Sequence, residues 1–153
     1  MAVTGKTYNP AFLAMRTCDI DFESDDIRVM LVASGYTFDK DHAVLNDITN
    51  EVTNSQGTGY ERKALANRSV TLVADDVIYD ADNPQYTGIN TNEELAAAIV
   101  YKHVTDDTDS IPIFYCEFLD SEGNAAPLPT NGSDVEARIS DENGISKDTN
   151  ILA

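Results

Sequence analysis

Two apolar runs separated by a short polar stretch constrain the fold of this chain most. IPIFYCEFL, residues 111–119, is dense in β-branched and aromatic side chains and is typical of a buried strand. The preceding segment, NEELAAAIVYKHV, is ambiguous, because its glutamates and alanines favour a helix whereas Ile99, Val100 and Tyr101 favour a strand. We expect a strand from about Ala97 to Val104, joined to residues 111–119 as a hairpin through the polar turn at 105–110.

A second strong strand signal follows Asp21. In DFESDDIRVMLV the hydrophobic period becomes two, and from Val29 onward both faces are apolar, which predicts an internal strand. Shorter strands are expected at 70–73, 76–80, 86–89 and 135–139, with a tight connection at Asp75-Asp76. Residues 36–56 are predicted to be a long loop with one irregular turn, and the polar residues after Gly144 to lie extended.

These signals together predict the domain organisation. Residues 1–20 are expected to form an N-terminal arm, extended over 1–8, with a short helix that begins at Asn9-Pro10 and runs to Met15. Residues 21–153 are expected to form one domain with a polar C-terminal tail, which the length of 153 residues allows. Many short strands with little helix predict an all-β fold, a single antiparallel β-sandwich of jelly-roll-like or immunoglobulin-like strand order.

The net charge restricts the classes of partner. The chain carries 27 acidic residues against 10 basic ones, a formal net charge of −17. Such a chain repels nucleic acid, so we expect no nucleic-acid partner. The acidic surface fits either an ordinary solvated exterior or docking onto a basic surface. The N-terminal segment lacks the apolar core of a secretory signal, and no stretch reaches the ~20 apolar residues of a membrane span. We therefore expect no membrane partner, and a chain made in the cytoplasm that leaves only within a larger assembly.

Catalytic and metal-binding patterns are weak. The two histidines, His42 and His103, are distant in sequence, and neither a nucleophile elbow nor a phosphate-binding glycine loop occurs, so we predict no enzyme and no cofactor. Cys18 and Cys116 form no zinc or redox pattern, and Cys116 is predicted to be a buried thiol.

The acidic runs 19–26 and 105–109 are dense in oxygen ligands, but neither matches a spaced calcium loop, so no metal site is predicted. An alternative interpretation is a calcium- or carbohydrate-binding β-sandwich for host attachment, with Tyr36, Tyr60, Tyr86 and the acidic loops as its site. A hydrolase using paired carboxylates ranks last, because sugar clefts are lined with aromatics and the chain has no tryptophan.

The segment GTGYERKALANRSVT, residues 57–71, contains the remaining candidate site. Gly57 and Gly59 suit a turn, Tyr60 is predicted to be an anchor in the core or at an interface, and Arg62 and Lys63 are expected to be solvated. Together with Arg68 they form one of the few basic groups in the chain, and we hypothesise that Tyr60, Arg62, Lys63 and Arg68 are interface residues that dock on an acidic neighbour. The same side chains also fit an ordinary solvated loop tip.

The order of several segments resembles a known family. Six segments follow one another between about Asp21 and Ile145. They are, in order, DFESDDIRVMLV, NDITNEV, Gly-x-Gly-Tyr, VIYDAD, the hairpin AIVYKHVTDDTDSIPIFYCEF and DENGI. In this order they resemble small virion structural proteins of tailed bacteriophages. In many of these proteins glycines follow the Gly-x-Gly-Tyr segment, where this chain has ERKALAN.

The resemblance implies a non-enzymatic virion component. The role it implies first is a capsid decoration, or cement, protein that binds the outer shell and stabilises contacts between capsid subunits. Its implied partners are the major capsid protein and other copies of itself, in a homotrimer, and its implied location is the capsid surface. A tail or neck component of the same particle is the alternative within this class.

Overall fold

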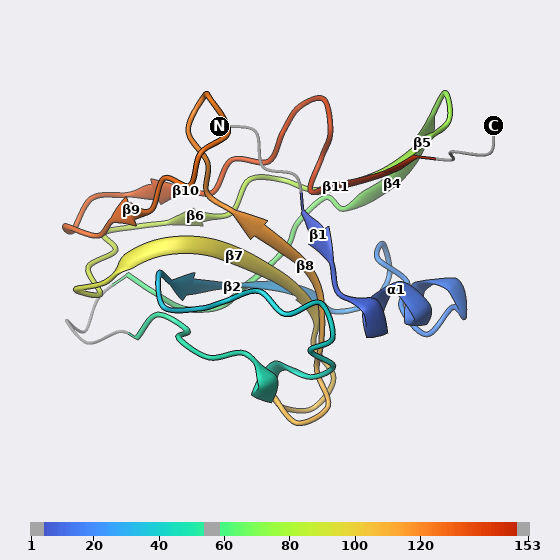
Figure 1. Cartoon of the computed structure of the whole chain (residues 1–153), viewed down its shortest axis with the longest axis horizontal. Helices are drawn as coiled ribbons and strands as arrows, with labels where there is room; N and C mark the ends of the chain where they lie inside the picture. The colour runs from blue at the N-terminus through green and yellow to red at the C-terminus, as the bar shows by residue number, and fades with distance from the viewer. Residues whose placement is uncertain (1–4, 54–58, 150–153) are drawn as a thin grey trace.

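The computed structural model describes residues 5–53 and 59–149, and it confirms an all-β sandwich with a short helix (Figure 1). The helices are α1 (Asn9–Arg16) and the single 3-10 turn η1 (Leu45–Asp47). The strands are β1 (Lys6–Thr7), β2 (Ile27–Ala33), β3 (Lys63–Ala64), β4 (Ser69–Val73), β5 (Asp76–Asp80), β6 (Gln85–Tyr86), β7 (Glu94–Lys102), β8 (Ile111–Glu117), β9 (Leu128–Pro129), β10 (Val135–Glu136) and β11 (Ser146–Thr149).

The main sheet has the order β1-β8-β7-β2-β3, with β9 also paired to β7, and these neighbouring strands are antiparallel. The expected β7–β8 hairpin is at its centre, with Ile99 opposite Tyr115 on one side and opposite Met30 on the other. These strands are buried on both faces, which explains why their sequences are nearly continuous apolar runs. The expected internal strand at β2 is thereby confirmed.

Two smaller sheets cover one face of the main sheet. In Figure 1 the pair β10-β6 lies above β7 and the sheet β11-β5-β4 lies at the upper right, and side chains such as Val29, Val100 and Ile145 pack between the layers. Gly144 takes a positive φ of 61° and donates its N–H to Ser140, which turns the chain into β11. The polar segment after Gly144 is extended, as expected, and it forms a strand paired with β5.

Residues 34–53 cover the opposite face, on the lower side of Figure 1. Phe38 stacks on Tyr115 with ring centroids 5.0 Å apart, and Tyr36 packs against Tyr115 in a tilted arrangement at 5.8 Å. The hydroxyl of Tyr36 also meets that of Tyr8 at 2.9 Å and Nδ1 of His42 at 3.0 Å. The predicted long loop with one irregular turn, η1, is correct through residue 53, and its last residues lie outside the described part of the chain.

Several boundaries differ from the expectations. β7 begins at Glu94 rather than Ala97, because Leu95 pairs with Ala33 and is fully buried, so packing overrides the helical propensity of the glutamates and alanines. Two expected strands are shorter than predicted. In the region expected at 86–89 the strand is β6, Gln85–Tyr86, and in the region expected at 135–139 it is β10, Val135–Glu136. The turn between β4 and β5 is at Ala74-Asp75, one residue earlier than expected, with Ala74 at φ 53°.

The N-terminal segment is part of the main sheet and its packing. β1 pairs with β8, Tyr8 is fully buried, and α1 follows as predicted but extends to Arg16. Residues 1–4 of the expected arm and 150–153 of the expected tail lie outside the described residues. No helix in the described ranges is long and apolar enough to span a membrane.

Candidate functional site

The described residues hold one well-connected cluster of charge, which we call the Arg62 cluster: Glu51, Tyr60, Arg62 and Asp107. The Arg62 guanidinium donates to both oxygens of Glu51 at 2.7 and 2.6 Å and to both oxygens of Asp107 at 2.6 and 2.8 Å. The Tyr60 hydroxyl donates to Glu51 at 2.6 Å. The two bidentate pairs use four N–H donors of the guanidinium and connect three separate segments of the chain.

The cluster lies where two short segments share one edge of β2. β3 pairs with Arg28 and Val29, and Glu51 forms an isolated bridge with Val32. Between these pairings the backbone N–H of Leu31 donates instead to the Tyr60 hydroxyl at 3.2 Å. The Leu31 carbonyl accepts from the Val52 N–H at 3.0 Å, so Tyr60 supplies the acceptor for the one Leu31 group on this edge that the backbone leaves unpaired.

The third segment is the turn between β7 and β8, which supplies Asp107. Arg62 also lies over the ring of Tyr101 on β7, 5.6 Å from its centroid. The Arg62 cluster thus connects the edge of β2, the loop that covers the lower face and the tip of the central hairpin.

The electrostatics keep Arg62 and Asp107 charged and Tyr60 protonated. Hydrogen bonds to Asp107 and Glu51 raise the pKa of Arg62, and the bond from Arg62 lowers the pKa of Asp107. Burial, followed by the charge of Glu51, raises the pKa of the Tyr60 phenol far above its ordinary value. These shifts move the pKa values of Arg62, Asp107 and Tyr60 further from neutral pH. The cluster is therefore suited to holding segments together rather than to exchanging protons.

The predicted basic group is divided among separate partners. Lys63 pairs with Glu61 at 3.3 Å and lies over the ring of Tyr86. Arg68 donates to the backbone carbonyls of Phe22, Leu65, Glu23 and Asp25 at 2.6–3.0 Å.

The expectation that Arg62 and Lys63 are solvated is wrong, because both are half-buried and paired within the chain. The prediction that Tyr60 is an anchor is confirmed for the chain's own core, against which it packs. A role of Tyr60, Arg62, Lys63 and Arg68 in an interface stays a prediction. Gly57 and Thr58 of the preceding turn lie outside the described residues.

Sequence reasoning missed Glu51 and Asp107, the two carboxylates that hold Arg62. They are 11 and 45 residues away from it in sequence, and no local spacing relates them to it. The acidic sequence offered 27 candidate partners, so the opposite charge by itself could not identify them.

The acidic runs bind the backbone of their own turns. Asp21 accepts from the N–H groups of Glu23 and Ser24, and Asp109 accepts from those of Thr105 and Asp106. Within residues 5–53 and 59–149, no group of three or more histidine, cysteine or acidic side chains could hold a metal ion. These carboxylates form local turns of the kind that aspartate favours.

The tyrosines of the alternative sugar- or calcium-binding site do not form an open surface. Tyr36 and Tyr86 belong to the buried core, and Tyr60 is half-buried and stacks on Tyr86 with ring centroids 6.1 Å apart. Tyr36 and Tyr86 are therefore core residues, and the sugar- or calcium-binding function stays a prediction.

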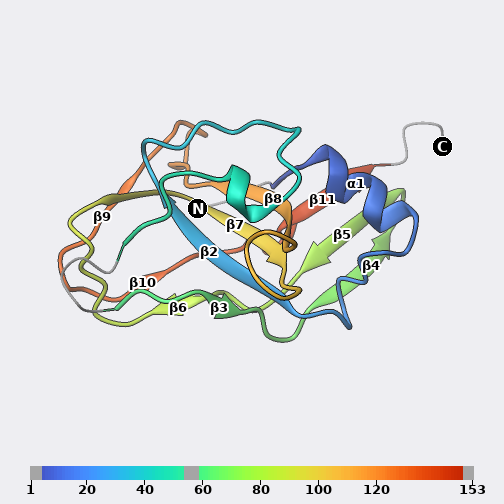
Figure 2. The same ribbon diagram turned by 90° about the horizontal axis from the view of Figure 1, so that it is seen from below.

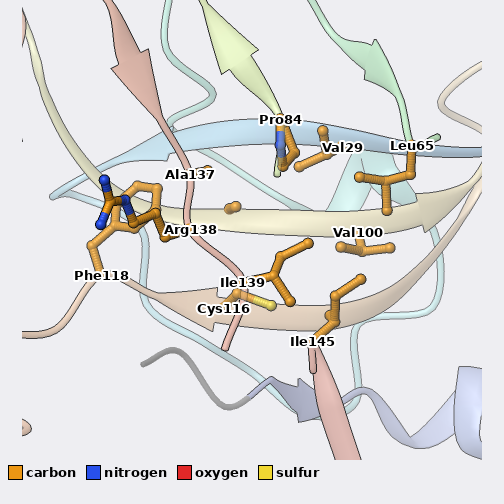
Figure 3. Close-up of a pocket in the computed structure, with 11 residues that line it drawn as sticks. Val29, Leu65, Pro84, Val100, Cys116, Phe118, Ala137, Arg138, Ile139 and Ile145 are labelled. Carbon is orange, nitrogen blue, oxygen red and sulfur yellow. The ribbon is translucent and has the colours of Figure 1, made fainter. Parts of the chain in front are cut away.

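A small apolar cavity lies between the two layers of the sandwich (Figure 3). Its volume is about 30 Å³, and its walls include Val29, Val100 and Cys116 from the main sheet and Ala137 and Ile145 from the covering layer. Burial raises the pKa of the Cys116 thiol to about 12, so this predicted buried thiol stays protonated. A space of this size holds about one water molecule, and it is a packing gap rather than a ligand site.

Comparisons with protein-family models, with curated proteins and with solved structures found no match to this chain.

Proposed function

We propose that this chain is a non-enzymatic structural protein of a tailed-bacteriophage virion, and that it acts as a capsid decoration protein. In this role it binds the outer shell, with the major capsid protein as its partner, and stabilises contacts between capsid subunits. The proposal includes self-association as a homotrimer on the capsid surface.

The observation that carries the proposal is where the phage-like segments lie in the fold. DFESDDIRVMLV contains β2, NDITNEV contributes Glu51 to its edge, the tyrosine of Gly-x-Gly-Tyr is Tyr60, and the hairpin segment forms β7, Asp107 and β8. Segments distant in sequence therefore meet at the Arg62 cluster. A resemblance spread over segments that contact one another in the fold supports a shared fold more strongly than the same number of isolated motifs would.

The first test is the copy number of the chain in purified particles. Quantitative mass spectrometry against the major capsid protein should give a ratio near one to one. A ratio of a few per cent would reject the decoration role and assign the chain to the neck or tail of the particle. Purified protein should also bind assembled, expanded shells and not free capsid subunits, and a failure to bind shells would reject the proposal.

The structure determines which variant tests the proposed basic interface. Reversing Arg62 or Arg68 would break internal contacts, so a loss of binding would not identify an interface. Lys63→Glu changes the basic residue with the weakest internal pair, while Arg138→Glu offers a matched control on an exposed side chain. Weaker shell binding of K63E alone would support the interface, whereas unchanged occupancy would reject it for Lys63.

A further inference from the structure

The outer edge of β4 is a strand edge without a partner in the described part of the chain. The sheet order β11-β5-β4 makes β4 the last strand, and Figures 1 and 2 show the β4–β5 hairpin at the end of the molecule, beside α1. Leu72 is 73 % exposed and Val73 55 % exposed, among the most exposed large apolar side chains described. Such an edge is a template for a further strand.

The hydrogen bonds show which backbone groups are open. Val70 donates its N–H to the Glu23 carboxylate at 3.0 Å, so this N–H points away from β5. Residues alternate along an antiparallel ladder, and Leu72 therefore directs its N–H and C=O to the same outer side. Glu23 occupies the start of this edge, and the open section is centred on Leu72.

The edge also lacks the charges that normally protect such strands. Residues 69–74, SVTLVA, contain no charged side chain in a chain with 37 residues of either sign, 27 acidic and 10 basic. Natural edge strands are commonly blocked by lysine, proline or inward-pointing charges. The charges are instead at the two ends of the open section, where Glu23 and Asp75 are located.

A groove runs between this hairpin and α1. Its walls include Met15 from α1, Ile20 and Phe22 from the segment after it, and Val70 and Tyr79 from the hairpin, and its volume is about 270 Å³. Val70 and Tyr79 are opposite each other, so Leu72, two residues further along β4, faces the same side. A strand added beside β4 would place alternate side chains on this side, next to the groove.

The charges beside the open section of β4 determine which kind of strand can pair with it. If two copies paired antiparallel about Leu72, Glu23 of one copy would lie next to Asp75 of the other, and both chains carry a net charge of −17. We propose that the outer edge of β4 accepts an extended segment of a different protein, with alternating apolar side chains at its centre and lysine or arginine at its ends. It adds as a fourth strand to the β11-β5-β4 sheet, its cations meet Glu23 and Asp75, and one apolar side chain enters the groove.

The test uses the full chain and a defined peptide. A blocked peptide with a Val-Thr-Val-Thr-Val centre and two lysines at each end is titrated into ¹⁵N-labelled protein, and the amide signals are followed by NMR. We expect saturable shifts in β4 and slower hydrogen exchange of the Leu72 amide. A peptide that is N-methylated at every central residue has no amide N–H on either edge and should not pair, and one with glutamates in place of the lysines should bind more weakly.

Two variants separate strand pairing from other contacts. Leu72→Pro removes the outward N–H but no bond to β5, and it should weaken peptide binding about tenfold or more, as expected for a lost hydrogen bond and a blocked edge. Leu72→Thr keeps the N–H and serves as the matched control. An unchanged signal of the buried Ile99 amide shows that each variant is folded.

Three outcomes would overturn the inference: no saturable shift at Leu72, equal binding of the glutamate peptide, or concentration-dependent self-association through β4 that L72P abolishes. The last would assign the edge to a second copy. This inference does not rest on the proposed function, because peptide binding and particle copy number are measured separately and either can fail alone.

Discussion

Replacing Arg62 by methionine measures what the Arg62 cluster contributes to stability. The variant keeps much of the aliphatic stem and removes the charge and four charge-assisted hydrogen bonds of 2.6–2.8 Å. Glu51 and Asp107 then remain near each other as two like charges, without the cation between them. The loss therefore includes both the missing bonds and the new repulsion.

The magnitude follows from the burial of the three side chains, which are 26, 29 and 39 % exposed for Arg62, Glu51 and Asp107. Exposed ion pairs contribute about 0.2–1 kcal/mol, and breaking a fully buried pair costs about 3–5 kcal/mol. The Arg62 cluster is intermediate, so we expect a loss of about 2–3 kcal/mol in the free energy of unfolding. For a domain of this size the midpoint of thermal unfolding should fall by about 5–10 °C.

The assay is urea unfolding at pH 7, with Lys40→Met as control. Lys40 pairs with Asp41 at 2.6 Å, but both side chains are 62 % exposed, so K40M should unfold like the wild type. If R62M also unfolds within about 0.5 kcal/mol of the wild type, the range typical of surface substitutions, the reasoning is refuted.

The pH dependence gives a second check. Arg62 lowers the pKa of Asp107 in the folded chain, so the stabilisation is present above the unfolded pKa of about 3.9 and is lost as the pH falls through the folded pKa. The difference between wild type and R62M should be constant from pH 5 to 8 and shrink below about pH 4. A difference that is unchanged at pH 2 would contradict the assignment.

Three further predictions concern other parts of the fold. Gly144→Ala should lower the free energy of unfolding in urea by about 2 kcal/mol or more, because Gly144 has a positive φ and the new Cβ would collide with the Tyr79 carbonyl. The control Gly123→Ala also has a positive φ but open space around its Cβ, so it should cost only about 1 kcal/mol. Cys18 is exposed and should react with a thiol reagent in the native protein, while buried Cys116 should react only on unfolding. Mass spectrometry of the labelled native protein should find the label on Cys18 alone, and label on both cysteines would contradict the burial of Cys116. Burial raises the pKa of Asp148, so the ionised carboxylate opposes folding at neutral pH. Asp148→Asn should therefore raise the midpoint of thermal unfolding at pH 7, and this gain should vanish below the unfolded pKa of about 3.9. A lower midpoint for D148N at pH 7 would contradict this prediction.

The strands that form the centre of the fold could be predicted from local sequence, whereas the candidate site could not. β2 and β8 are apolar on both faces, and this pattern has few interpretations other than a buried strand. The start of β7 was harder, because local propensity favoured a helix where Leu95 is buried beside Ala33. In the candidate site, Tyr60 could be predicted as an anchor from its neighbourhood, but its role at Leu31 depends on a gap in pairing that only the assembled sheet contains.

The sequence by itself determined the class of fold, the hairpin at its centre and the acidic character of the chain, because hydrophobic period and charge are local or additive properties. The tertiary structure alone decided how the few cations are used. The sequence suggests that Arg62 and Arg68 belong to one basic surface group. In the fold, Arg62 binds carboxylates 11 and 45 residues away in sequence, and Arg68 binds backbone carbonyls. It also left the uncharged strand β4 at an edge. Which charges are paired and which strand stays open are set by long-range contacts, and no spacing along the chain encodes them.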